Sequence, residues 1–141
     1  MPRSDNLTLI VLKGHLLVEE ELNEILNLKL RLPKALFDAR LSFNQRLAVL
    51  KALLGSERDS GIRFKAIEHL NSLRNKLAHN LEPKALEESV RICLAEFKEP
   101  DREQDFSEEK MSVRLKRCLA LLCGELSGFN HAGRSLQIPT I

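Results

Sequence analysis

Apolar residues recur at helical spacing along most of the chain, in segments that proline, glycine or charged residues separate. Between Leu7 and Leu30 the spacing predicts one long helix, whose expected buried stripe consists of Leu9, Leu12, Leu16, Leu26 and Leu30. Glu19 and Asn23 fall on the same stripe, where the period calls for apolar residues. Two interpretations are open. In the first, this face is only partly buried or the two side chains satisfy each other. In the second, Glu19 points into a polar site shared with the helix that contains Arg74.

The next segments carry their own start and stop signals. Pro33 predicts a short helical turn that breaks between Ala39 and Ser42. Ser42 is a suitable N-cap for a helix that Gly55 ends, and the apolar stripe of this helix is Phe43, Leu47, Leu50 and Leu54. Residues 56–61 are predicted to form a polar loop.

A second amphipathic helix is predicted from Asp59 or Ser60 to the residues before Pro83, with Asn80 as a left-handed cap. Its apolar face consists of Ile62, Ala66, Ile67, Leu70, Leu73 and Leu77. A shorter helix is expected over residues 84–97 and a charged loop over 98–107. A last helix is expected from Ser107 to about Ser127.

No segment shows the alternation of a β-strand, so the sequence predicts an all-α protein. The expected architecture is a compact helical bundle of about five to six helices in a single domain over residues 1–128, followed by a flexible tail over residues 129–141. A chain of 141 residues is long enough to bury a core.

Composition indicates in which compartment this bundle occurs and what it can bind. No apolar run approaches the roughly 18–20 residues that a membrane span needs, so we expect no membrane association. The three cysteines, Cys93, Cys118 and Cys123, form no metal-binding pattern and leave an odd thiol, which indicates a reducing cytoplasm. The formal net charge of +2 is too small to indicate nucleic-acid binding by itself, so any RNA contact has to come from a local patch.

Three polar residues, Arg74, Asn75 and His79, lie close together at the end of the helix predicted before Pro83. Elsewhere there is no metal-ligand spacing and no glycine-rich phosphate loop, so we expect neither a metal nor a cofactor. Positions five apart lie about 140° apart around a regular helix, so Arg74 and His79 diverge unless the helix ends just before the histidine. With such an end, the three side chains would point into one groove.

These side chains suit the metal-free cleavage of RNA. Histidine is a base that titrates near neutral pH and can take the proton of a 2′-hydroxyl, and arginine is a permanent cation that can stabilise a phosphorane. A second proton donor must reach the leaving oxygen, and a second copy of the motif across a two-fold axis would supply it. The alternative is structural, because an arginine and a histidine at a helix end can simply satisfy carbonyls or carboxylates.

The stretch Arg74-Asn75-Lys76-Leu77-Ala78-His79 resembles the Arg-x4-His signature of the HEPN superfamily, compact all-α proteins that include many metal-independent endoribonucleases. Residues 15–26 (H-L-L-V-E-E-E-L-N-E-I-L) resemble the first helix of that family, with an inward acid at Glu19. Residues 42–55 (S-F-N-Q-R-L-A-V-L-K-A-L-L-G) are similar to HEPN branches that include the mannitol-repressor-like proteins. The likeness covers about residues 7–125.

The resemblance implies a homodimer with the two motifs facing each other in one cleft, in which Arg74 and His79 are catalytic and Asn75 is positioning. Glu19, Asn23 and Lys76 are candidates for supporting roles. Members of the family commonly act as toxins of toxin–antitoxin pairs or in phage defence, and they cut RNA to leave a cyclic phosphate. Leu81 stands where one toxin branch has a tyrosine that its antitoxin adenylylates, which excludes that route of silencing but not another antitoxin.

Three hypotheses follow. The first is a cytoplasmic HEPN-type ribonuclease dimer that acts on RNA. The second is a non-catalytic regulator or interaction module of the mannitol-repressor-like kind, in which Arg74 and His79 only hold the dimer together. The third is a protein that binds RNA or a nucleotide without cutting it.

Overall fold

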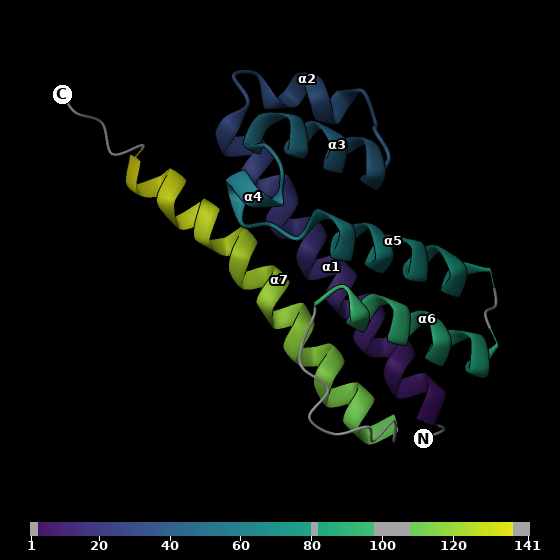
Figure 1. The fold of residues 1–141 in the computed structure, drawn as a ribbon. Coiled ribbons are helices and arrows are strands. Elements are labelled where there is room, and N and C mark those ends of the chain that lie inside the picture. Colours follow the sequence, from purple (N-terminus) through teal and green to yellow (C-terminus); the bar gives the residue numbers. More distant parts are fainter. Residues whose placement is uncertain (1–2, 80–81, 98–107, 137–141) are drawn as a thin grey trace.

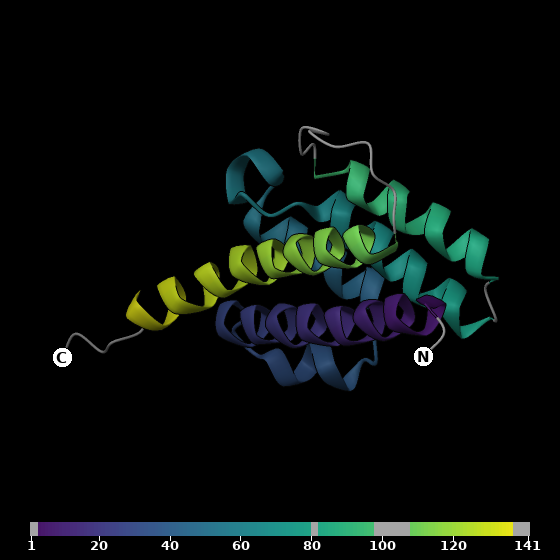
Figure 2. The same cartoon turned by 90° about the horizontal axis from the view of Figure 1, so that it is seen from below.

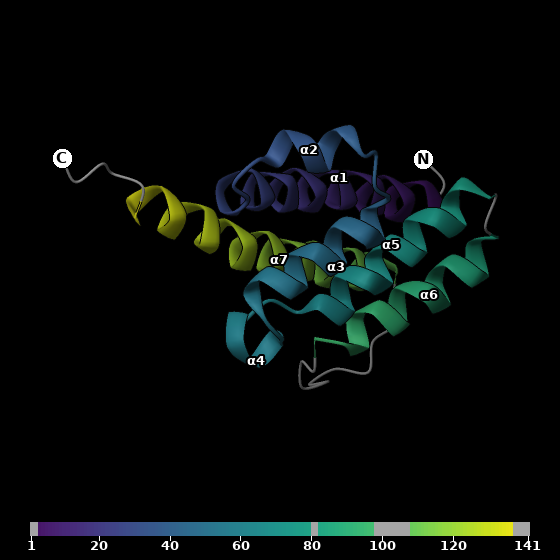
Figure 3. The ribbon, with the colours of Figure 1, turned by 90° about the horizontal axis from the view of Figure 1, so that it is seen from above.

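The computed structural model describes residues 3–79, 82–97 and 108–136, and this part of the chain contains seven α-helices and no β-strand (Figure 1). The all-α prediction is therefore confirmed. In chain order the helices are α1 (Arg3–Lys29), α2 (Pro33–Asp38), α3 (Phe43–Leu54), α4 (Glu57–Ser60), α5 (Phe64–Ala78), α6 (Pro83–Ala95) and α7 (Glu108–Leu136). The two longest, α1 and α7, lie side by side and run in the same direction (Figure 2). Helices α3, α5 and α6 pack across one side of this pair (Figure 3).

The buried face of α1 differs from the predicted one. Leu9, Leu12 and Leu16 are 45%, 44% and 56% exposed, and Leu26 is the one residue of the predicted stripe that is fully buried. The face that enters the core instead consists of Leu7, Val11, Val18, Leu22 and Ile25. Between Leu7 and Val18, leucine, isoleucine and valine residues occur on several sides of α1, so its period alone cannot select which side is buried.

Helix α7 selects that side through a close approach at Gly14. A Cβ placed on Gly14 would lie 2.4 Å from Cδ1 of Leu119, so a larger residue there requires the Leu119 side chain to move. Nearer the other end of the pair, the Asn130 amide of α7 donates a hydrogen bond to the backbone oxygen of Glu21. The orientation of α1 therefore depends on a helix about 100 residues later in the sequence.

Three predicted boundaries are wrong. Residues 57–60 form one helical turn, α4, instead of a loop, because Ser56 and Asp59 make a capping box. Helix α5 then begins at Phe64, later than the predicted start at Asp59 or Ser60. The last helix continues nine residues past Ser127 to Leu136, and Asn130 in this extension is buried, so a flexible tail does not begin at residue 129. The predicted charged loop over 98–107 and residues 137–141 lie outside the described residues.

No helix in the described part of the chain is both long enough and apolar enough to cross a membrane. Cys93 and Cys118 are buried in the core, as their apolar helix faces predict, and Cys123 is partly buried. Burial raises the pKa of the Cys93 thiol to about 12, so this group is an inert part of the packing at neutral pH.

Candidate functional site

The polar motif lies at the end of α5, and the helix ends where the sequence argument required. Ala78 is the last helical residue, and His79 leaves the helix with φ −107° and ψ 29°. The backbone N–H of His79 still donates to the carbonyl oxygen of Lys76, which closes the last turn. The next helix starts at Pro83, whose ring suits a first helical position. The predicted cap Asn80 is outside the described residues.

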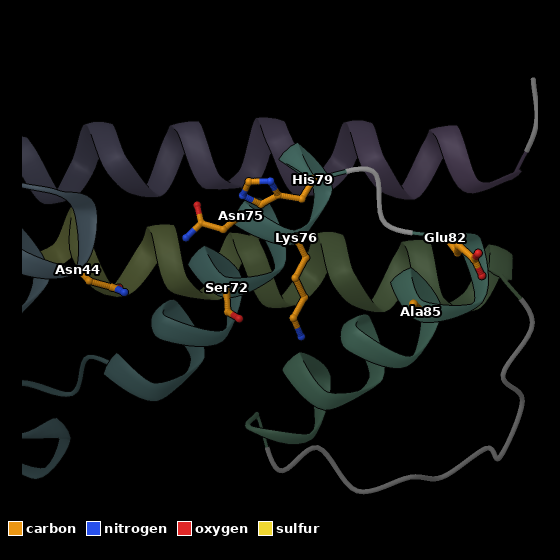
Figure 4. Close-up of a pocket in the computed structure, with 7 residues that line it drawn as sticks. All are labelled: Asn44, Ser72, Asn75, Lys76, His79, Glu82 and Ala85. Carbon is orange, nitrogen blue, oxygen red and sulfur yellow. The ribbon is translucent and has the colours of Figure 1, made fainter.

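An open pocket of about 600 Å³ lies between the end of α5, the start of α6 and the start of α3 (Figure 4). Its wall contains three residues of the motif, Asn75, Lys76 and His79. Asn75 and His79 are four residues apart and therefore face the same side of α5. The remaining wall consists of Asn44 from α3, Ser72 from α5, Glu82 before α6 and Ala85 on α6.

Arg74 does not line this pocket, so the expectation that all three motif residues point into one groove is wrong. Its positive charge lowers the pKa of His15 on α1, which places the guanidinium on the α1 side of α5. The reason is geometric. The helix stays regular through Ala78, so the turn of about 140° between positions 74 and 79 is kept almost in full.

The motif side chains are available to a ligand. Arg74, Asn75, Lys76 and His79 are all exposed. Across residues 3–79, 82–97 and 108–136, no hydrogen bond or ion pair involves the side chains of Arg74, Asn75 or His79. The predicted alternative, that the arginine and histidine satisfy carbonyls or carboxylates at the helix end, therefore finds no support among these residues.

A second polar group lies under this surface, between α1, α3 and α5. Nε2 of His15 donates to Oδ1 of Asn71 over 3.0 Å, and Nδ2 of Asn71 donates to Oδ1 of Asn44 over 3.1 Å. His15 and Asn71 are 6% and 5% exposed, so each places a polar group in the core and gives it a partner. The ring of His15 also packs 4.6 Å from the ring of Phe43, measured between centroids. We call His15, Asn71 and Asn44 the amide chain.

Glu19 and Asn23 meet a residue of α3, not each other. Oε1 of Glu19 lies 3.7 Å from Nη2 of Arg46, and Oε2 lies 3.9 Å from Nδ1 of His15. Arg46 also donates a hydrogen bond to Oδ1 of Asn23. The face that carries them is partly buried, as the first interpretation expects, but the two side chains do not pair with each other. Among the described residues, Glu19 is connected to α5 only through His15, so the interpretation that it points into a polar site shared with that helix stays a prediction. Neither residue lines the pocket, so their contribution to it passes through Arg46 and the amide chain.

Burial is the main reason that the pKa of His15 is lowered from its usual 6.5. The hydrogen bond that His15 donates to Asn71 and the charge of Glu19 oppose this shift, while the charges of Arg74 and Arg46 add to it. His15 is therefore a neutral structural histidine at physiological pH. Because Oδ1 of Asn71 can only accept, the neutral ring carries its proton on Nε2.

The sequence analysis missed His15, Asn44, Arg46 and Asn71. His15 and Asn71 had a usable signal, because each stands where the helical period places core residues. His15 follows Val11 by four and precedes Val18 by three, and Asn71 follows Ile67 by four. A polar residue at such a position is buried and needs a partner, which is a reason to search for one. Asn44 is exposed and Arg46 lies at the margin of the apolar face of α3, so neither gave a comparable signal.

Within the described residues, no group of three or more His, Cys, Asp or Glu side chains could hold a metal ion. The exposed groups at the pocket are an imidazole, two carboxamides, a hydroxyl, an ammonium and a carboxylate, from His79, Asn44, Asn75, Ser72, Lys76 and Glu82. Such a set can exchange protons and bind anions without a metal.

Comparison with protein-family models, with curated proteins and with solved structures finds no match to this chain. The geometry of the pocket and the residues of the motif are therefore the observations that bear on function.

Proposed function

We propose that this chain is a metal-independent endoribonuclease of the HEPN type. The supporting observation is the pocket at the end of α5, where His79, Asn75 and Lys76 face an open volume of about 600 Å³. This volume lies within the range of about 300–1,000 Å³ for pockets that bind small ligands or single units of a polymer. The imidazole and the carboxamide in it have no partner in the described part of the chain, which leaves both for a substrate.

In the proposed reaction, His79 takes the proton of a ribose 2′-hydroxyl, and the 2′-oxygen forms a bond to the adjacent phosphorus. The bond from phosphorus to the 5′-oxygen breaks, and a second acid gives that oxygen a proton. The products are a 2′,3′-cyclic phosphate and a 5′-hydroxyl. In this proposal Lys76, which lines the same pocket, stabilises charge on the phosphorane, and Asn75 holds a phosphate oxygen.

The position of Arg74 supports a two-fold dimer in which each pocket receives this arginine from the other copy. Within one chain, Arg74 and His79 face different sides of α5, so one copy does not combine them. Helix α1, on the side of Arg74, exposes Leu9, Leu12 and Leu16 in one row. An exposed apolar row of this kind is typical of a protein interface.

The first experiment measures cleavage of a single-stranded RNA in the presence of a chelator. We expect His79→Ala to lose about 10²- to 10⁴-fold in rate, because it removes the general base. Its melting temperature should stay at the wild-type value, because the side chain is exposed. His69→Ala is the matched control on the same helix, since His69 pairs with Glu96 and does not line the pocket. Wild-type protein that leaves RNA intact would count against the proposal.

A mixing experiment tests the shared pocket. Arg74→Ala and His79→Ala proteins should each be inactive, and a reassorted mixture should regain activity, because one of the two pockets in a mixed dimer has both residues. Random reassortment would give about a quarter of the wild-type activity, since half of the dimers are mixed and each has one intact pocket of two. A mixture as inactive as its components would show that Arg74 and His79 act within one chain or that no dimer forms.

A toxin function in a toxin–antitoxin or phage-defence system follows from the same proposal. We expect induced expression of the wild type to arrest growth and expression of His79→Ala to be harmless. An antitoxin that silences the protein would have to act without a tyrosine, because the chain has none.

The second candidate function is a non-catalytic regulator or interaction module of the mannitol-repressor-like kind. Two observations favour it: Arg74 does not reach the pocket, and α1 exposes a row of leucines that suits a partner protein. This function replaces the first if Arg74→Ala and His79→Ala differ from the wild type neither in RNA cleavage nor in their effect on growth, while Leu12→Asp or Leu16→Asp disrupts an assembly with a partner protein.

A further inference from the structure

Asn44 joins the pocket of His79 to a second one. The first pocket contains Asn44 together with Asn75, Lys76 and His79, and the second, of about 460 Å³, contains Asn44 together with Leu47, Ala48, Lys51 and Glu68. Because they share Asn44, the two pockets are neighbours along α3 and α5, and we call them together the trough.

The amide chain fixes which atoms Asn44 offers to the trough. Asn71 uses its Nδ2 as donor to Oδ1 of Asn44, and it uses its own Oδ1 to accept from His15. The oxygen of Asn44 is thus occupied from the core side. The amide nitrogen keeps its hydrogens, and it has no acceptor among the described residues. In Figure 4 this nitrogen points from Asn44 toward Ser72 and the interior of the pocket.

The surroundings indicate what the nitrogen would bind. An amide N–H pair donates to oxygen atoms that only accept, such as the unbridged oxygens of a phosphodiester. A lysine lines each pocket, Lys76 in the first and Lys51 in the second, so a phosphodiester between the two would have a cation on either side. In the second pocket, Leu47 and Ala48 provide an apolar floor, and Glu68 can accept hydrogen bonds from a base.

We propose that the second pocket is a nucleotide subsite and that Asn44 donates hydrogen bonds to the phosphodiester that joins its nucleotide to the one at His79. The substrate is then single-stranded RNA that occupies both pockets, because paired strands would not fit one nucleotide into each. This inference rests on the proposed function for the identity of the substrate, but the trough and the amide chain do not depend on it. His15 and Asn71 act as positioning residues, since they hold Asn44 in one orientation.

The test measures binding of a fluorescent single-stranded RNA octamer to full-length protein that carries His79→Ala, so that nothing is cut. Adding Asn44→Asp keeps the oxygen that Asn71 needs, removes the donors and adds a negative charge, so the fold should be retained. We expect the dissociation constant to rise about tenfold or more. Asn44→Leu, which removes the donors without adding charge, should raise it about fivefold at every salt concentration. Asn27→Asp, on the exposed side of α1, adds the same charge away from the trough and should change binding less than about twofold.

Cleavage by protein that retains His79 separates the subsite from the proposed function. Substrates with one ribonucleotide in a deoxynucleotide chain are compared at minimal length and with one added nucleotide on either side. Asn44→Leu should raise KM more for the longer substrate than for the minimal one. The melting temperature is measured beside the kinetics, because this variant also removes the acceptor of Nδ2 of Asn71. Equal effects of Asn44→Leu on both lengths, or unchanged RNA binding, would overturn the subsite even where cleavage is normal. If the wild type does not cut RNA but the Asn44 variants still weaken binding, the subsite stands and the ribonuclease proposal fails.

Discussion

Asn71 and Asn75 lie one turn apart on α5, and their side chains meet opposite surroundings. Asn71 is 5% exposed and bonded to His15 and Asn44. Asn75 is exposed, faces the pocket and has no partner in the part of the chain that the structure describes. The same contrast separates His15, which is buried, from His79, which is exposed. Identical residue types thus serve packing in one place and remain free for a ligand a turn away, so burial and partners distinguish the two roles where residue type does not.

The largest difference in stability should separate the alanine variants of these two asparagines. Asn71→Ala leaves the buried Nε2–H of His15 without an acceptor and should lower the free energy of unfolding by about 2–3 kcal/mol. Asn75→Ala should change it by less than about 0.5 kcal/mol, because an exposed side chain without partners contributes little. Urea unfolding measures both. Equal losses would show that the contrast between the two positions has no energetic basis.

A smaller difference should separate two ion pairs. Arg46 is 14% exposed and reaches both Glu19 and Asn23, whereas Lys34 is 81% exposed and pairs with Asp38 on the surface of α2. Arg46→Ala should lower the free energy of unfolding by about 1–2 kcal/mol, since it also uncovers the ring of Phe43. Lys34→Ala is the matched control and should cost less than about 0.5 kcal/mol. If Lys34→Ala were as harmful as Arg46→Ala, burial would not be the deciding factor.

The smallest effect should appear as a pH dependence of unfolding. The folded pKa of His15 is below its unfolded value of 6.5, so the unfolded chain binds the proton first as the pH falls. The contribution of neutral His15 is therefore complete above about pH 6.5 and is lost as the pH decreases toward the folded pKa. Glu19, Arg46 and Arg74 are the charged groups that act on this ring. In His15→Gln the fall in stability between pH 6.5 and pH 5 should be shallower than in the wild type, and an unchanged slope would assign it to other groups.

Local signals were sufficient where an element depends on its own residues. For α3, the sequence predicted the N-cap Ser42 and the stop at Gly55, and the structure shows a capping box between Ser42 and Gln45 and a final bond from Gly55 to Lys51. The predicted core residues Phe43, Leu47 and Leu50 of this helix are buried. These features follow from contacts within three or four residues, which the sequence displays directly.

Sequence signals failed where a structural feature depends on a residue far away in the chain. The buried side of α1 is set by α7, and no feature of residues 7–30 reveals that contact. The amide chain joins positions 15, 44 and 71, so its members became recognisable only when three helices met. At the motif, the sequence identified Asn75, Lys76 and His79 as candidate site residues, and these three line one pocket. It also predicted Arg74 in the same groove, because the helix was expected to end early enough for Arg74 and His79 to face the same side.

The parallel pairing of α1 with α7 has a consequence for the time at which the protein folds during synthesis. Asn6 and Ser112, which share a hydrogen bond, are separated by 106 positions, and α7 leaves the ribosome after the other six helices. At about 5–20 residues per second, α1 waits roughly 5–20 seconds for the helix that covers its core face. His15 on α1 holds Asn71 and thereby Asn44, so the pocket wall depends on a helix whose core face is still uncovered during this wait. We expect a nascent chain stalled before α7 to lack the pocket, even though every residue that lines it has already been made.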